Sequence, residues 1–178
     1  MQKASYLRQH PEIYMPLKET NFFVFEGQKV NFLGPGDNEK INSYSVTDLN
    51  TYLSLFQNIA SEKAIGEASA LYLYSEVAPQ RIKIYCPRVK LIAILRQPVT
   101  RAFSHFKMNL KQQREPFTNF LKAFWASKSR IQNHWGWTWD YIGAGFYYER
   151  LKKYFSIFNK TQIKVFLYEL AFCRFFHP

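Results

Sequence analysis

Two short apolar runs are the clearest signals in the hydrophobic pattern. Leu91–Leu95 is uninterrupted between Lys90 and Arg96, and residues 163–168 (Ile-Lys-Val-Phe-Leu-Tyr) form the second run. Runs this short are typical of strands that are buried on both faces, as in a parallel sheet. The pattern therefore predicts two buried strands, the first of which ends at Arg96, and a weaker strand at residues 64–67.

Apolar residues at helical spacing predict the helices. Pro98 suits the first helical position, where its missing N–H costs nothing, and the spacing continues far enough to predict a helix from Pro98 to about Gln113. Phe22–Phe25 is either a short strand or a packed aromatic cluster. The other predicted helices are one capped by Ser45 or Thr47 and reaching Ile59, one at 78–85 with Ile82 and Tyr85 inward, one from Pro116 through Phe124, and one within 145–158. Strands that alternate with helices favour one α/β domain over residues 1–178, with a parallel sheet.

The composition indicates a globular protein with an anionic partner. Of the 178 residues, 47% are apolar and 19% are aromatic, which excludes a disordered tail. Lys and Arg outnumber Asp and Glu by 24 to 13, a net charge of +11. This surplus favours nucleic acid, a membrane surface, or a phosphorylated or sulfated small molecule. The basic residues are scattered rather than clustered, so nothing specific points to nucleic acid.

Cysteine usage and the absence of long apolar segments bear on location. Cys86 and Cys173 lack metal-ligand spacing and suggest a reducing compartment or simple use in the core. No signal peptide is visible, and no apolar run approaches the ~20 residues of a membrane helix. We therefore expect a soluble, cytoplasmic protein.

The carboxyl end of the first predicted strand is the candidate ligand site. Arg96 lies there beside a helix N-terminus, which is where ligands bind in open α/β sheets and where phosphate is readily held. Ser104 follows within two helical turns, with a hydroxyl for the same anion. The alternative is that Arg96 merely caps a sheet edge and that Ser104 is packed or solvated. From the pattern alone, both interpretations stay open.

Several segments, in order along the chain, resemble the sulfotransferases that use 3′-phosphoadenosine 5′-phosphosulfate (PAPS), especially the heparan-sulfate-like and bacterial branch. They are residues 6–15, 18–23, 66–69, 78–82, 90–106, 145–151 and 165–169. The most specific is Leu-Arg-x-Pro-x-x-Arg-Ala-x-Ser, which ends at Ser104. The resemblance implies a P-loop-type parallel β-sheet flanked by helices. It also implies transfer of a sulfuryl group from PAPS to a hydroxyl or amine of a glycan or small metabolite, without a metal.

The resemblance assigns three residues to the cofactor. Arg96 and Ser104 match the pair that holds the 3′-phosphate of PAPS or of its product adenosine 3′,5′-bisphosphate (PAP). Lys3 matches the lysine of the 5′-phosphosulfate loop, which would neutralise charge on the bridging oxygen as sulfate leaves. The alternative for Lys3 is an ordinary terminal lysine.

The resemblance assigns four residues to the acceptor side. Glu19 matches the catalytic base, which takes a proton from the acceptor during its attack on sulfur. Lys18 would bind the acceptor or tune this carboxylate, although Lys18 and Glu19 are otherwise a solvated loop pair. Glu67 and Ser69 lie where the family lines the acceptor cleft.

The chain also departs from the family pattern. The Gly-Thr-Thr portion of the phosphosulfate loop does not follow Lys3, Ala68 replaces a frequent lysine, and residues 171–178 fit no motif. We therefore expect a member truncated at both ends, with an incomplete sheet. The alternatives to an active sulfotransferase are a catalytically inactive remnant and a basic module that binds nucleic acid or sulfated glycan.

Overall fold

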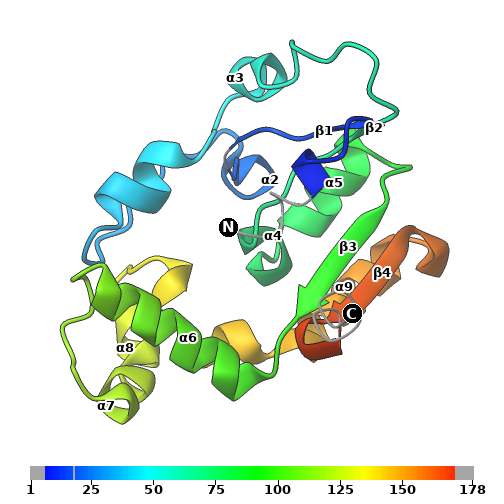
Figure 1. The fold of residues 1–178 in the computed structure, drawn as a ribbon. Helices are drawn as coiled ribbons and strands as arrows, with labels where there is room; N and C mark the ends of the chain where they lie inside the picture. Colours follow the sequence, from blue (N-terminus) through cyan, green and yellow to red (C-terminus); the bar gives the residue numbers. More distant parts are fainter. Residues whose placement is uncertain (1–6, 18, 171–178) are drawn as a thin grey trace.

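The computed structural model describes residues 7–17 and 19–170, in which two pairs of parallel strands are flanked by helices (Figure 1). Strand β1 (Ile13–Tyr14) pairs with β2 (Ala64–Ile65), and β3 (Leu91–Leu95) pairs with β4 (Ile163–Leu167). In the second pair the register runs from Leu91 opposite Ile163 to Leu95 opposite Leu167. The parallel α/β class predicted from the sequence is therefore confirmed.

The strand β3 has the predicted bounds but is not buried on both faces. Ile92 and Ile94 are 59% and 40% exposed, whereas Leu95 is 9% exposed. Successive side chains of a strand point to opposite faces, and here only one face lies against the core. The prediction of burial on both faces was wrong for β3 and also for β4, in which residues 165–167 are 38–50% exposed, because an apolar run alone does not show whether a second layer covers it.

Helix α6 (Pro98–Lys111) follows β3 directly. Pro98 occupies its first turn as predicted, and the side chain of Gln97 caps it by accepting a hydrogen bond from the Thr100 N–H at 2.6 Å. The helix buries Ala102 and Phe106. It ends at Lys111, two residues before the predicted end.

Among the other helical segments, those at residues 49–54, 78–85, 120–125 and 147–157 correspond to predicted helices, some of them shorter than expected. Residues 22–25, expected as a strand or a packed aromatic cluster, form a helix, and the remaining segments were not predicted. Besides α6, the helical segments are α2 (Phe22–Phe25), the π-helix η1 (Asn38–Asn42), α3 (Leu49–Ser54), α4 (Leu71–Tyr74), α5 (Ala78–Tyr85), α7 (Phe120–Trp125), α8 (Ser127–Gln132), the 3₁₀ segments η2 (Trp137–Trp139) and η3 (Gly143–Gly145), α9 (Tyr147–Ile157) and the 3₁₀ segment η4 (Lys160–Gln162). The cap of α3 is Asp48, which accepts from the Thr51 N–H at 2.8 Å, and not Ser45 or Thr47. An Asx side chain directly before the first turn satisfies the free N–H groups better than a hydroxyl farther upstream.

Helix α5 has the predicted bounds, but of the two residues predicted to point inward, Ile82 and Tyr85, only Ile82 is buried. Ile82 is 4% exposed, whereas Tyr85 is 40% exposed, with its ring centre 5.9 Å from the ring centres of Phe22 and Phe23. Tyr85 lies in the last turn of the helix, where the phenol reaches Glu26 instead.

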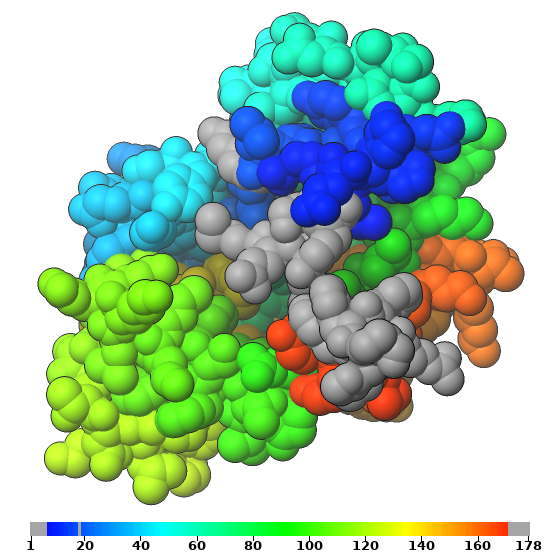
Figure 2. Space-filling view, in the orientation of Figure 1, coloured from blue at the N-terminus to red at the C-terminus, as the bar shows by residue number. Residues whose placement is uncertain are grey.

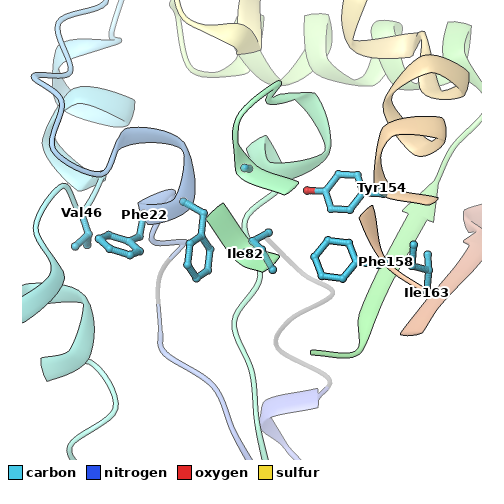
Figure 3. Close-up of a cluster of buried hydrophobic side chains, with 8 residues drawn as sticks. Phe22, Val46, Ile82, Tyr154, Phe158 and Ile163 are labelled. Atoms are coloured by element: carbon cyan, nitrogen blue, oxygen red, sulfur yellow. The ribbon is translucent and has the colours of Figure 1, made fainter. Parts of the chain in front are cut away.

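A continuous apolar cluster joins α2 and α5 to α9 and β4 (Figure 3). Its buried members are Phe22, Phe23, Val46, Ala78, Ile82, Tyr154, Phe158 and Ile163. Each large apolar side chain buried in this way stabilises the fold by about 1.5–3 kcal/mol relative to exposure. The cluster therefore fixes the loop before α2 relative to the β3–β4 pair.

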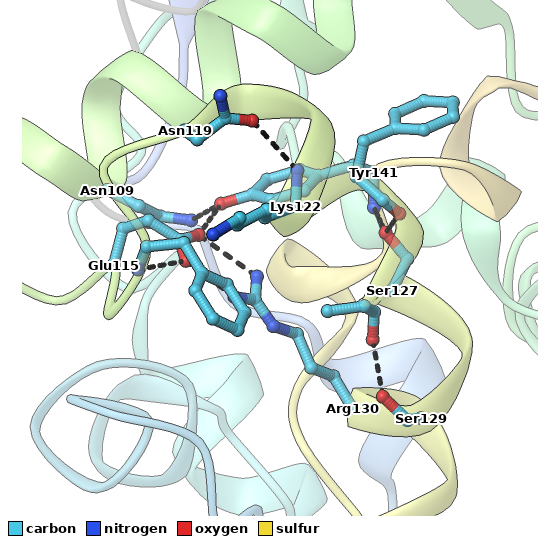
Figure 4. A network of polar contacts seen from close by, with 11 residues as sticks. Asn109, Glu115, Asn119, Lys122, Ser127, Ser129, Arg130 and Tyr141 are labelled. Carbon is cyan, nitrogen blue, oxygen red and sulfur yellow. Dashed lines mark hydrogen bonds and ion pairs between the residues drawn. The ribbon is translucent and has the colours of Figure 1, made fainter.

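Helices α6, α7 and α8 form a lobe at one end of the molecule (Figures 1 and 2). The lobe has its own apolar cluster around Ala102, Phe106 and Tyr141 and, beside it, a buried ion pair between Arg130 and Glu115 (Figure 4). The Tyr141 hydroxyl donates to Glu115 at 2.5 Å and accepts from the Asn109 amide at 2.9 Å. This network ties α8 and the loop after it to α6. Within residues 7–17 and 19–170, every helix is too short or too polar to cross a bilayer.

Candidate functional site

A pocket lies at the junction of β3 and α6. Its volume is about 510 Å³, within the range of small-molecule sites. The lining residues are Arg96, Val99, Thr100, Phe103, Ser104, Lys107 and Phe120. The two residues predicted to hold a phosphate, Arg96 and Ser104, therefore face the same cavity.

Arg96 has unused hydrogen-bonding capacity in this pocket. Its guanidinium carbon lies 5.0 Å from the centre of the Tyr168 ring, a cation–π contact that orients the group. Its Nε is buried and has no hydrogen-bond partner in the described part of the chain. A buried donor without a partner costs about 1–3 kcal/mol, and an anion in the pocket would remove this cost. The residues present thus fit a phosphate group.

The pocket-facing side of α6 carries polar groups at helical spacing. Thr100, Ser104 and Lys107 follow one another at intervals of four and three residues, which places them on one face of the helix. The Thr100 hydroxyl donates a hydrogen bond to the Gln97 carbonyl at 2.9 Å. The side chains of Ser104 and Lys107 make no hydrogen bond or ion pair with another described residue, so both are available to a ligand.

The predicted base, Glu19, lies in a second group of residues, at the carboxyl ends of β1 and β2. Burial raises the pKa of the half-buried Glu19 carboxyl above its ordinary value, although a hydrogen bond with the Ala70 backbone opposes the shift. A raised pKa makes the carboxylate a stronger base. Lys18 beside it, like Lys3, lies outside the described residues.

Glu67 and Ser69 contact the loop that carries Glu19. Glu67 accepts hydrogen bonds from the hydroxyls of Thr20, Tyr72 and Tyr52. Ser69 Oγ accepts from the backbone N–H of Thr20 at 3.2 Å. Three of the four acceptor-side residues predicted from the sequence, Glu19, Glu67 and Ser69, are thus brought together.

The titration of this group follows from its burial. Burial raises the pKa of Glu67 above its ordinary value, while hydrogen bonds from Thr20, Tyr72 and Tyr52 lower it, and the nearby Glu19 carboxyl raises it further. Burial and the adjacent Glu67 raise the pKa of Tyr72, so this hydroxyl stays protonated and donates. No hydrogen bond or ion pair between described residues links this group to Arg96 or Ser104.

Sequence reasoning missed the residues that complete these two groups. Lys107 could have been found, because it is spaced three residues from Ser104 on a predicted helix. Thr20 and Tyr72 could not, because their contact joins positions 52 residues apart. Tyr52 lies within the helix predicted to reach Ile59, but no local signal shows that its hydroxyl reaches Glu67, at 3.3 Å.

His105, which follows Ser104, packs away from both groups. Its ring centre lies 5.6 Å from that of Trp137, and Nδ1 lies 3.3 Å from the Arg101 guanidinium. Burial, together with the charge of Arg101, lowers the pKa of His105 to about 4. The imidazole is therefore neutral near pH 7 and is held between an aromatic ring and a cation.

The chain matches the crystal structure of a sulfotransferase from Alicyclobacillus acidocaldarius with a TM-score of 0.89 and 37% sequence identity. The match covers 96% of this chain and 68% of that chain. No protein-family model matches the chain, and neither does any curated protein. The similarity in fold and sequence therefore extends over nearly the whole of this chain.

Proposed function

Because the chain belongs to the sulfotransferase family, we propose that it transfers a sulfuryl group from PAPS to a hydroxyl or amine of a glycan or small metabolite. Residues 1–178 are proposed to act as one sulfotransferase domain. The observation that supports PAPS as the donor is the pocket after β3. There the Arg96 Nε and the Ser104 hydroxyl, which have no hydrogen-bond partner among residues 7–17 and 19–170, face one cavity.

Arg96 and Ser104 are proposed to hold the 3′-phosphate. A planar guanidinium donates to two phosphate oxygens at once, and a hydroxyl adds a neutral donor. When bound, PAPS supplies a sulfuryl group activated by its attachment to phosphate. The role of Arg96 and Ser104 is positional: they fix the end of the donor that does not react, which lowers the entropic cost of alignment.

Glu19 is proposed to accept the proton of the attacking hydroxyl or amine at its carboxylate. Its raised pKa, caused by burial, brings it closer to neutral pH, where a general base is most effective. Roles for Lys3 at the leaving oxygen and for Lys18 at the acceptor remain proposals that rest on the resemblance of residues 1–23 to the family.

Calorimetric titration with PAP tests the donor site directly. We expect the double variant Arg96→Ala, Ser104→Ala to lose about 2–4 kcal/mol of binding, or roughly 30- to 1,000-fold in Kd, because one charged and one neutral hydrogen-bonding group are removed. The matched control is Arg88→Ala with Ser129→Ala, which removes the same groups from exposed positions outside the pocket. The control should bind PAP as the wild type does.

Two outcomes would contradict the proposal. Wild-type protein that binds no PAP would rule out the donor site and leave an inactive remnant. Binding that falls steeply with salt, equally in both double variants, would indicate a basic module that recognises charge alone.

Transfer of radiolabelled sulfate from PAPS to p-nitrophenol and to a glucosamine oligosaccharide tests the base. Glu19→Gln should lower turnover by about 100- to 10,000-fold, the usual contribution of a general base. Glu62→Gln, an exchange outside both groups of site residues, is the control. Unchanged turnover in Glu19→Gln would exclude the role.

A further inference from the structure

The pairing of β1 with β2 brings two loops side by side. The Gly66 N–H donates to the Tyr14 carbonyl at 3.0 Å, which extends the ladder by one bond beyond β2. The chain after β1 leads to Glu19, and the chain after β2 leads to Glu67 and Ser69. The two loops therefore leave the same edge of the strand pair together.

The side chain of Thr20, next to the proposed base, is held by Glu67. Thr20 is fully buried, and its hydroxyl donates to one oxygen of Glu67 while lying 2.9 Å from the Tyr72 hydroxyl. The other oxygen of Glu67 accepts from Tyr72 at 2.5 Å and from Tyr52 at 3.3 Å. Both carboxyl oxygens are thus engaged by the protein's own hydroxyls.

The backbone after Glu19 is held by Ser69. Its Oγ accepts from the N–H of Thr20 at 3.2 Å and from the N–H of Asn21 at 3.1 Å. Asn21 has φ 53°, in the left-handed region that non-glycine residues seldom adopt and that needs support from its surroundings. Ser69 supplies that support through two bonds to consecutive amides.

We propose that Glu67 and Ser69 are positioning residues that hold Thr20 and Asn21 and thereby fix the direction of the Glu19 carboxylate. This proposal rests on the proposed function of Glu19 as base. It differs from the acceptor contacts implied by the family resemblance, because Glu67 and Ser69 form hydrogen bonds with Thr20 and Asn21 of the protein itself. Their effect on the reaction is exerted through the loop, and the Ala70 backbone, next to Ser69, reaches Glu19 itself.

A split between kcat and KM tests the proposal. Ser69→Ala and Thr20→Val should each lower kcat by about 10- to 100-fold, because a displacement of about 1 Å at a reacting group has effects of this size. The KM for the acceptor and the Kd for PAP should change less than twofold. Thr20→Ser keeps the hydroxyl and should restore most of the activity.

The matched control is Ser127→Ala. Ser127 is as fully buried as Thr20, and its Oγ also accepts a backbone N–H, that of Tyr141 at 3.2 Å. It lies in the α6–α8 lobe, so its loss should cost similar stability and leave kcat unchanged. A higher acceptor KM with unchanged kcat in Ser69→Ala would overturn the proposal and indicate direct contact with the acceptor.

A second measurement does not depend on an acceptor. Titration of the Glu19 carboxyl by ¹³C NMR should show a lower pKa in Ser69→Ala and Thr20→Val, because a released loop hydrates the carboxyl that burial now disfavours in its charged form. Ser127→Ala should titrate as the wild type does. A Glu19 pKa that is the same in all variants would refute the positioning role. Failure of wild-type protein to bind PAP would refute the proposed function without affecting this result.

Discussion

The buried ion pair of the α6–α8 lobe gives the sharpest prediction of stability. The side chains of Arg130 and Glu115 are 4% and 0% exposed, and the guanidinium donates to both carboxyl oxygens, at 2.5 and 3.0 Å. The Arg130 guanidinium carbon also lies 5.2 Å from the ring centres of both Trp135 and Trp139. Arg130→Met keeps an unbranched side chain of similar length but removes the charge and all the donors.

The loss of stability expected for Arg130→Met follows from the surroundings of the Glu115 carboxylate that is left behind. Glu115 keeps hydrogen bonds from the Phe117 N–H and the Tyr141 hydroxyl, but its charge is left buried without a counter-ion. Breaking a buried pair by removing one partner costs about 3–5 kcal/mol. For a chain of this size each kcal/mol lowers Tm by about 2–4 °C, so the expected drop in Tm is roughly 6–20 °C.

Thermal and urea unfolding of matched variants check this magnitude. The control is Lys153→Met, which breaks an ion pair whose side chains are 38% and 76% exposed and which should cost only about 0.2–1 kcal/mol. The double variant Arg130→Met, Glu115→Leu should lose at least about 0.5 kcal/mol less than the sum of the single variants, because no lone charge remains buried. Equal losses for Arg130→Met and Lys153→Met, or strict additivity in the double variant, would refute the reasoning.

Three further predictions concern the site and its surroundings. Lys107→Ala should weaken PAP binding by about 1 kcal/mol, or roughly fivefold in Kd. Lys111→Ala, one turn farther along α6 and outside the pocket, should leave PAP binding unchanged. Equal Kd values for the two variants by calorimetry would exclude Lys107 as a ligand. Because burial raises the pKa of Glu19, sulfuryl transfer should be lost as the pH falls through a pKa that is higher than that of an ordinary glutamate. In the profile of kcat against pH, an acid limb at or below the ordinary glutamate pKa would contradict a buried base. Asp37→Ala should lower the free energy of unfolding by at least about 3 kcal/mol, because three buried N–H donors lose their acceptor. Glu39→Ala should have little effect in the same urea titration. Equal losses of unfolding free energy in the two variants would contradict this role of Asp37.

The part of the site that could be predicted from the sequence is the part built from adjacent residues. Strand β3 and the start of α6 were predicted because a short apolar run, a proline at N1 and helical spacing are local signals. Arg96 and Ser104 lie on this strand–turn–helix segment, so placing the segment placed them in one pocket.

The parts that could not be predicted depend on distant contacts. The exposure of Ile92 and Ile94 depends on which layers cover β3, and a strand's own residues do not encode that. The contact between Thr20 and Glu67 joins positions 47 residues apart, and nothing in either segment marks the other as its partner. The family resemblance identified Glu19, Glu67 and Ser69, but only the fold shows that two of them hold the loop of the third.

The donor-site residues and Glu19 are held in place by different kinds of contact, so we expect substitutions near each of them to have different effects. Arg96 and Ser104 are placed by β3 and α6, whose backbone bonds and apolar contacts persist when a side chain near Glu19 is altered. The loop that carries Glu19 is held by hydroxyl and carboxyl contacts between Thr20 and the stretch from Glu67 to Tyr72, so we expect loss of one of these contacts to loosen it. Substitution of Arg96 or Ser104 should therefore change the affinity for the donor. Substitution of a residue that holds the Glu19 loop should lower the rate of transfer and leave the affinity for the donor unchanged. A single variant near Glu19 that weakened PAP binding as strongly as Arg96→Ala would show that the two groups are coupled and that this separation is wrong.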